Sequence, residues 1–222
     1  MRAQQMIGPR SVLAAFAAVG AVAFLRRWSL GYGATGLERA MSLPGDECIP
    51  APDLASTRAI TIDTSPDRVW PWLAQLGQGR AGFYSYTSLE NLFGASIHNA
   101  DRVAPQWQDV KVGNHVDLAP GMPLDVVVVE PGHALVLAGG VPAHSSPFTF
   151  SWAFVLLARD HGSCRLVVRE RYGYTRRWSA LMVEPTELVS LLMSQRMLRG
   201  IRDRAQTAAI AADTATAAGI CS

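Results

Sequence analysis

The second half of the chain limits the fold most, because strands joined by short turns are followed there by one long helix. Alternating or valine-rich segments predict strands at 124–130, 133–137, 149–158 and 164–172. A helix is predicted from about Pro185 to Ala208. Antiparallel strands in series form a sheet that curls, and a helix across its concave face leaves a cavity between them. We therefore predict an α+β helix-grip fold, with the curved sheet wrapped on the C-terminal helix.

The C-terminal helix is expected to place one face on the core or on a cavity. Its apolar residues recur every four positions: Val189, Met193, Met197, Ile201 and Ala205. The Ala/Thr-rich residues that follow are expected to fray, as chain ends often do. We divide the chain into four parts: an apolar segment (1–30), a connector rich in Gly and Pro (31–56), the domain (57–212) and a frayed tail (213–222).

The domain is predicted to open with a strand at 57–63 and a helix directly after it. Ser65 suits the N-cap, and Pro66 suits the first helical position. Gly77 is predicted to end this helix as a left-handed cap. A second, short helix is predicted from the capping box of Thr87 and Glu90, with Gly94 as its stop.

Residues 77–82 read G-x-G-x-x-G, the pattern of dinucleotide-binding loops. Such a loop leaves a strand and opens a helix. Here the glycines follow a helix, so we predict no nucleotide and interpret Gly79 and Gly82 as turn residues.

The apolar run from Ser11 to Leu25 is shorter than the ~20 residues that span a bilayer. Three interpretations compete: a membrane anchor, a signal peptide cleaved after Ala21-Val22-Ala23, or a soluble helix. Arg26-Arg27 stand where they would hinder export, and they favour a cytoplasmic domain. We expect a membrane-associated protein with a cytoplasmic domain, with export after cleavage as the alternative.

Charge and metal-ligating residues exclude several classes of function. The net charge of +2 is too small to predict a nucleic-acid partner. Cys48, Cys164 and Cys221 have no zinc-binding spacing, and the five histidines are scattered along the chain. We therefore expect no metal, no cofactor and no nucleic acid.

The chain resembles the START-like (SRPBCC) superfamily, which includes polyketide cyclases and lipid-transfer domains. The resemblance covers roughly 57–210 and rests on element order, on Thr64–Trp70 and on the amphipathic last helix. A narrower resemblance to actinobacterial proteins of unassigned function rests on four phrases: Leu43–Asp46, Thr57–Ile62, Gly79–Tyr86 and Ile97–Arg102. The resemblance implies a hydrophobic cavity and a bound lipid-like or polyketide-like molecule. It supplies no shared catalytic set.

Glu170 is the first candidate for chemistry, because period 2 places it on the apolar face of its strand. Arg165, Arg169 and Arg171 fall on the opposite face. Glu170 is either an acid or base at the cavity or the partner of an arginine. His98 and Asp101 form either a general-base pair or part of a polar network that holds a loop.

A set of aromatic, methionine and arginine side chains is expected to contact the ligand: Arg80, Tyr84, Tyr86, Trp107, Trp152, Met193 and Met197. Core packing is the stronger interpretation for Trp152. Binding of a hydrophobic small molecule is the predicted function, and a cyclase or dehydratase that uses Glu170 or His98/Asp101 is the alternative. A structural domain with a filled core is the third class, which the absence of a cavity above ~300 Å³ under the helix would favour.

Overall fold

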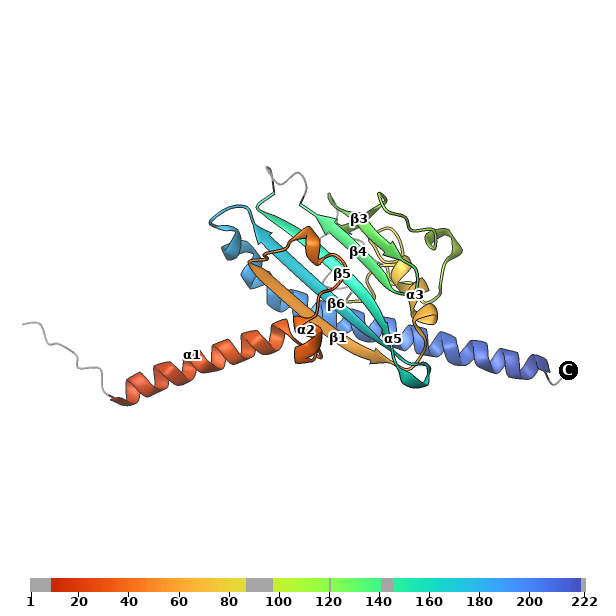
Figure 1. The fold of residues 1–222 in the computed structure, drawn as a ribbon, viewed down its shortest axis with the longest axis horizontal. Helices are drawn as coiled ribbons and strands as arrows, with labels where there is room; N and C mark the ends of the chain where they lie inside the picture. The colour runs from red at the N-terminus through yellow and green to blue at the C-terminus, as the bar shows by residue number, and fades with distance from the viewer. Residues whose placement is uncertain (1–8, 87–97, 120, 141–145, 221–222) are drawn as a thin grey trace, which may run out of the picture.

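In the computed structural model, which describes residues 9–86, 98–119, 121–140 and 146–220, one antiparallel sheet forms the body of the domain. The strand order is β1-β6-β5-β4-β3-β2, and Figure 1 shows the sheet curving around the last helix. The strand bounds are β1 Leu54–Ile62, β2 His115–Ala119, β3 Met122–Glu130, β4 Ala134–Gly139, β5 Phe148–Ala158 and β6 Cys164–Tyr174. Strands β2 to β6 lie side by side in chain order. Strand β1 pairs with β6 and forms the edge of the sheet opposite β2.

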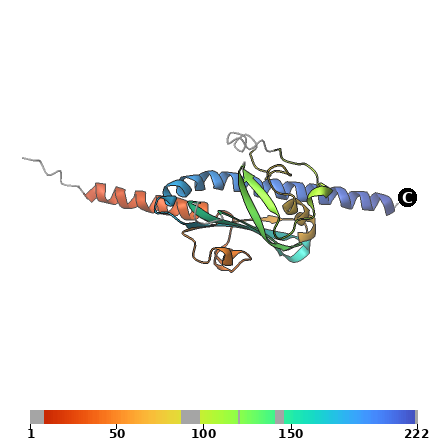
Figure 2. The same cartoon turned by 90° about the horizontal axis from the view of Figure 1, so that it is seen from above.

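One long helix, α5, crosses a face of this sheet, and the connector covers the other face (Figure 2). The helix bounds are α1 Pro9–Leu30, α2 Gly36–Ala40, α3 Pro66–Ala74 and α5 Ser179–Ile220. Short 3-10 turns occur at Asp46–Cys48, Pro105–Trp107 and Asp160–Gly162. The arrangement confirms the predicted α+β helix-grip fold, with the apolar helix α1 projecting from one end (Figure 1).

The main core lies between the concave face of the sheet and the helices α3 and α5. Buried side chains of this core come from all three parts, among them Trp72, Leu73, Leu137, Phe154, Leu166, Met197 and Ile201. A smaller cluster on the convex face, including Leu43 and Val167, packs the connector against the sheet. The helix is thus fixed on one side of the sheet and the connector on the other.

The first strand begins earlier than predicted, inside the segment expected to be a connector. Leu54 pairs with Tyr172, and the pairing continues to Ile62 opposite Cys164. The reason is that β6 offers backbone partners along its whole length, which the local sequence around Pro50 and Pro52 does not reveal. β1 is therefore long enough to carry Ser56 and Arg58 under α5.

The last helix is longer at both ends than predicted. It begins at Ser179 instead of Pro185, which lies inside the helix, and it continues to Ile220 through the predicted tail. Asp213 pairs with Arg68, and the hydroxyl of Thr214 bonds to a carbonyl of the preceding turn. The helix thus extends into the predicted tail, and the fraying expected from residue 213 stays a prediction.

The glycine segment follows a helix, as predicted, but Gly77 does not end it. Helix α3 starts at Pro66 after the N-cap Ser65 and ends at Ala74, with Gln75 in the C-cap position. Gly77 instead pairs with Gly82 in an isolated bridge, which closes a tight loop around Gly79. Gly79 and Gly82 have φ of 70° and 74°, which confirms their role as turn residues. Residues 87–97, with the predicted Thr87–Glu90 capping box, lie outside the described residues.

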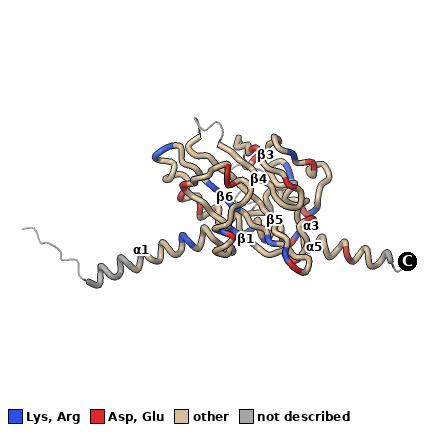
Figure 3. The backbone as a smooth tube through the Cα atoms, in the orientation of Figure 1, with Lys and Arg blue, Asp and Glu red and all other residues tan. Residues whose placement is uncertain are grey.

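Helix α1 contacts the domain near its C-terminal end, through Arg26 and Ser29. Figure 3 shows basic residues on α1 where the helix reaches the domain. There Arg26 pairs with Glu184, and the hydroxyl of Ser29 lies 3.1 Å from Glu187 Oε2 on α5. Among the described residues, no helix combines the length and the apolar character needed to cross a bilayer.

Candidate functional site

An apolar pocket of about 490 Å³ lies between the sheet and the first turns of α5. Strands β2 to β6 supply one wall and α5 the other. The side chains that line it are mostly apolar or aromatic: Leu118, Met122, Pro123, Leu124, Phe148, Phe150, Tyr172, Met182, Val183 and Thr186, with Ser146 at one side. This is the cavity that the helix-grip prediction expects between helix and sheet.

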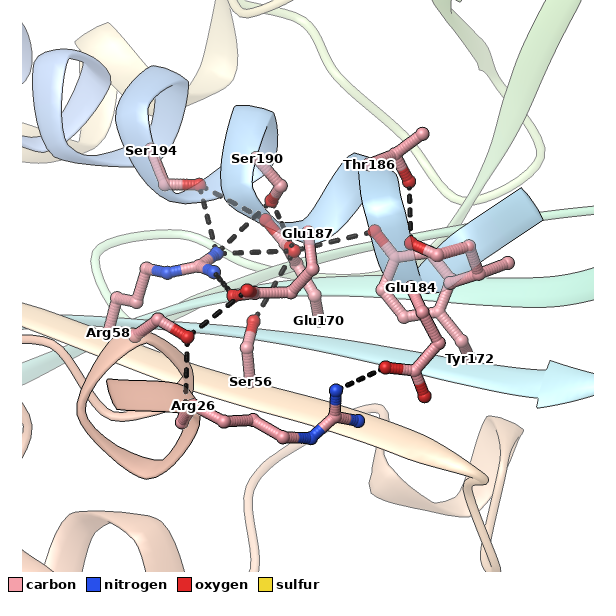
Figure 4. Close-up of polar contacts among 12 residues, drawn as sticks. Arg26, Ser56, Arg58, Glu170, Tyr172, Glu184, Thr186, Glu187, Ser190 and Ser194 are labelled. Carbon is pink, nitrogen blue, oxygen red and sulfur yellow. Dashed lines mark hydrogen bonds and ion pairs between the residues drawn. The ribbon is translucent and has the colours of Figure 1, made fainter. Parts of the chain in front are cut away.

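Tyr172 connects this pocket with a buried polar cluster. We define the Glu170 cluster as six residues that meet under α5: Ser56, Arg58, Glu170, Glu187, Ser190 and Ser194 (Figure 4). Tyr172 lines the pocket, and its hydroxyl lies 3.4 Å from Glu170 Oε2. One wall of the pocket therefore contains a tyrosine whose hydroxyl contacts the Glu170 cluster.

Glu170 faces inward, as its place in the strand predicts, and it is only 4% exposed. Its Oε2 accepts from Ser190 at 2.8 Å and lies 3.3 Å from Arg58 Nη1 and from Ser56 Oγ. Its Oε1 accepts from Ser194 at 3.1 Å. The predicted alternative, in which Glu170 pairs with an arginine, matches this geometry, although the arginine comes from β1.

Arg58 is 1% exposed and joins two carboxylates. Its Nη2 donates to Glu187 Oε1 at 2.7 Å, and its Nη1 lies within 3.3 Å of Ser190, Ser194 and Glu170. A buried guanidinium requires such partners, because an unpaired buried charge is very costly. The cluster therefore binds β1 and β6 to α5, and through Ser29 to α1.

The hydroxyl of Tyr172 stays protonated at physiological pH. Burial raises the pKa of Tyr172 well above its usual 10, and the Glu170 carboxylate beside it adds to the shift. Burial likewise raises the pKa of Tyr174 to about 12, with the nearby Glu184 carboxylate contributing. A neutral tyrosine beside a carboxylate donates a hydrogen bond to it, so the O–H of Tyr172 is directed to Glu170.

His98 and Asp101 are both exposed, and Asp101 pairs with Arg204 of α5 at 2.8 Å. The adjacent Asn99 accepts from the Tyr84 N–H at 2.6 Å and donates to the Ser85 carbonyl at 2.9 Å. These contacts agree with the predicted alternative of a polar network that holds a loop. A catalytic role for the His98/Asp101 pair stays a prediction.

Three of the predicted ligand-contact residues brace the loop or the core. Arg80 donates to the carbonyls of Ala74 and Trp107, and burial lowers its pKa. The buried Tyr84 hydroxyl donates to the Trp72 carbonyl at 3.2 Å. Trp152 is buried, as the core interpretation predicts, among other aromatic rings of the sheet and the loop.

The other predicted residues differ in burial. Met197 is buried in the core, Met193 and Trp107 are half-buried, and Tyr86 is exposed. Val189, which the pattern placed on the buried face of the helix, is 37% exposed. None of the seven predicted residues lines the pocket at the start of α5 in the described part of the chain. A ligand contact from them stays a prediction.

Sequence reasoning missed Arg58, although the strand pattern carried a signal. Arg58 shares a face with Ile60 and Ile62, so a charged residue stood on the apolar face of the first strand. Glu187, Ser190 and Ser194 likewise share one side of α5, since they are spaced by three and four residues. Polar residues on two faces predicted to meet would have indicated a buried cluster.

A larger hollow of about 810 Å³ lies on the convex face, between α1, the connector and β6. Its inner arginines are already occupied: Arg169 pairs with Asp46 and donates to the Met41 carbonyl, and Arg171 donates to the Ile49 carbonyl. These contacts attach the connector to the sheet. We therefore place the candidate site in the smaller, apolar pocket. No group of three or more His, Cys, Asp or Glu residues is arranged to hold a metal in the described ranges.

No protein-family model matches the chain, and no curated protein matches it. Solved structures of similar arrangement include the protein jhp0584 of Helicobacter pylori, with 13% identity, a TM-score of 0.48, and coverage of 75% of this chain and 96% of that one. Norcoclaurine synthase of Thalictrum flavum is 15% identical with a TM-score of 0.41, covering 68% and 84%. DynU16, a protein of the dynemicin biosynthetic locus, is 19% identical with a TM-score of 0.41, covering 67% of this chain and 47% of that chain. Similarity at this level concerns the fold alone, and we assign no function from it.

Proposed function

We propose that this domain is a START-like binding domain that takes up a hydrophobic or amphipathic small molecule between the sheet and α5. The observation that carries the proposal is the apolar pocket of about 490 Å³, which falls in the range of ligand sites in proteins. Its walls of aromatic and aliphatic side chains favour burial of apolar ligand surface. Tyr172 offers a polar group at one place, which is enough to orient a ligand.

The geometry favours binding over catalysis by Glu170. Both oxygens of this carboxylate already accept hydrogen bonds from serines, and Arg58 pairs with one of them. A carboxylate so occupied has little capacity left to take a proton from a substrate. We therefore propose a role for Glu170 in structure, and a ligand contact through Tyr172.

A tryptophan at position 186 is expected to block the pocket. Thr186 lines the pocket from α5, whereas Leu188 on the same helix does not line it. We expect Thr186→Trp to weaken binding of the neutral fluorescent probe N-phenyl-1-naphthylamine about tenfold or more, because the indole fills space that the probe needs. Leu188→Trp is expected to bind the probe like the parent chain. Probe titration on the full-length protein measures both.

Two outcomes would contradict this proposal. Failure of the parent chain to bind the probe, together with no retained apolar molecule in native mass spectrometry, would leave the pocket without a ligand. Equal affinity in the parent and in Thr186→Trp would place the probe elsewhere on the protein.

We further propose that α1 holds the domain at a membrane surface. Val22, Phe24 and Leu25 are well exposed on α1, and Leu181 is exposed on α5 close to the Arg26–Glu184 pair. Exposed apolar side chains beside basic residues such as Arg27 suit the interface of an anionic bilayer.

Membrane attachment is testable by sedimentation with vesicles. The full chain is expected to sediment with phosphatidylcholine vesicles containing phosphatidylglycerol and to stay in solution without them. The pair Phe24→Ser and Leu25→Ser is expected to reduce the bound fraction severalfold, because it removes apolar surface from the interface. Leu37→Ser, at an exposed position on α2, is the control and should have no effect. A parent chain that stays in the supernatant with vesicles would contradict the proposal.

A further inference from the structure

We infer that the pocket selects neutral ligands that carry a hydrogen-bond donor, such as an alcohol or phenol, and disfavours carboxylates. The inference rests on the proposed binding function and names the class of ligand. It follows from two properties of the pocket: the orientation of its hydroxyl groups and the charge behind Tyr172.

The side-chain hydroxyls that line the pocket already donate hydrogen bonds to other groups of the protein. Ser146 donates to the Phe148 carbonyl at 2.7 Å, and Thr186 donates to the Val183 carbonyl at 2.7 Å. The hydroxyl of Tyr172 is directed to Glu170 Oε2 at 3.4 Å. A hydroxyl whose proton is engaged offers only its lone pairs to a further partner. These three groups therefore present acceptors to the pocket.

The lining residues in the described ranges add no donor side chain. Apart from the three hydroxyls, they are aliphatic, aromatic, proline or glycine. A ligand with an O–H or N–H group finds acceptors there. A carboxylate is itself an acceptor, and it would lose its water without gaining a donor side chain from the described lining residues, which is costly for a charged group.

The charges behind Tyr172 act in the same direction. In the set of ion pairs behind Tyr172, the carboxylates of Glu170, Glu184 and Glu187 face the two guanidinium groups of Arg26 and Arg58. A further negative charge beside Tyr172 would be repelled by the excess carboxylate. Hydrogen bonding and charge therefore both favour a neutral donor over an anion.

Three probes on one ring system test the inference with the full-length protein at pH 7. 2-Naphthol carries a neutral donor, 2-methoxynaphthalene lacks the donor, and 2-naphthoate is an anion. We expect 2-naphthol to bind at least tenfold more tightly than 2-naphthoate. Affinities are measured by isothermal titration calorimetry.

A pair of tyrosine variants locates the acceptor. Tyr172→Phe removes the hydroxyl from the pocket, while Tyr174→Phe removes one that contacts Glu184 and does not line the pocket. We expect the affinity ratio of 2-naphthol to 2-methoxynaphthalene to fall roughly three- to tenfold in Tyr172→Phe, the size of one lost hydrogen bond. The ratio should not change in Tyr174→Phe. Comparing ratios cancels the different solvation of the two probes in water.

Each outcome supports or overturns the inference. Equal or tighter binding of 2-naphthoate to the parent chain overturns it while leaving the proposed binding function in place, and this comparison needs no variant to fold. An unchanged probe ratio in Tyr172→Phe also overturns it. If neither the three probes nor N-phenyl-1-naphthylamine binds and native mass spectrometry shows no retained apolar molecule, the proposed function fails, and the inference fails with it.

Discussion

Replacement of Arg58 by methionine is expected to lower the free energy of unfolding by about 3–5 kcal/mol, which is the usual cost of removing one partner from a buried ion pair. Methionine keeps most of the apolar stem but leaves two carboxylates, Glu170 and Glu187, without their guanidinium partner. The serines of the cluster still donate to Glu170, so the loss reflects charge more than hydrogen bonding. Urea unfolding followed by tryptophan fluorescence measures the change.

Arg165→Met provides the matched control on the opposite face of the sheet. Arg165 pairs with Glu38 of α2, where both side chains keep more contact with water than those of the Arg58–Glu170 pair. A pair that water reaches loses less when one partner is removed. We therefore expect a clearly smaller loss than in Arg58→Met. Equal losses would show that the Glu170 cluster is not a tightly coupled buried network.

Additional variants separate charge from packing. Glu170→Gln and Glu187→Gln, combined with Arg58→Met, remove all three charges with little change in shape. The triple variant is expected to be more stable than Arg58→Met alone, because no uncompensated carboxylate remains buried. A further loss in the triple variant would instead assign the stability to the hydrogen bonds of the carboxylates.

The local parts of the fold were predictable from sequence. The hairpin predicted from 149–158 and 164–172 appears as β5 and β6 with bounds shifted by at most two residues. Helix α3 begins at Pro66, as the Ser65-Pro66 signal predicts. These features depend on the alternation of apolar and polar residues and on the residues that start a helix. Both signals come from a few neighbouring residues.

The parts that depend on distant partners were not predictable. The start of β1 at Leu54 depends on pairing with Tyr172, more than a hundred residues away. The sequence predicts a last helix that starts at about Pro185, whereas the helix begins at Ser179 and carries the proline inside. A proline does fit a first helical position, so the local signal was misleading.

The predicted helix start also bears on the candidate pocket. Met182 and Val183 lie before Pro185 and are not among the predicted ligand contacts, which include Tyr84. In the structure these two residues form part of the pocket wall, and Tyr84 is buried beneath the helix. Strand period predicts the inward direction of Glu170 and also places Arg58 on the apolar face of its strand, but their pairing follows only from the register of β1 against β6.

Replacement of Gly200 by alanine is expected to lower the free energy of unfolding by about 2 kcal/mol. A Cβ at position 200 would lie 2.5 Å from the carbonyl oxygen of Tyr84 and 2.8 Å from its Cβ. Neither atom can move freely, because Tyr84 adopts a φ of 57° and its N–H bonds to Asn99. The close approach of α5 to this loop therefore requires glycine.

Gly20→Ala separates this contact from the helix propensity of the residue. Gly20 is also inside a helix, but a Cβ there would meet nothing within 4 Å. Alanine is intrinsically better than glycine in a helix by about 1 kcal/mol, so Gly20→Ala should not destabilise the protein. Alanine also has the better helix propensity at position 200. The expected loss there is therefore the cost of the clash minus this gain in propensity. A Gly200→Ala chain as stable as the parent would mean that the loop retreats from α5. The polar network of Asn99, Tyr84 and Ser85 would then be too soft to brace the helix beside the Glu170 cluster.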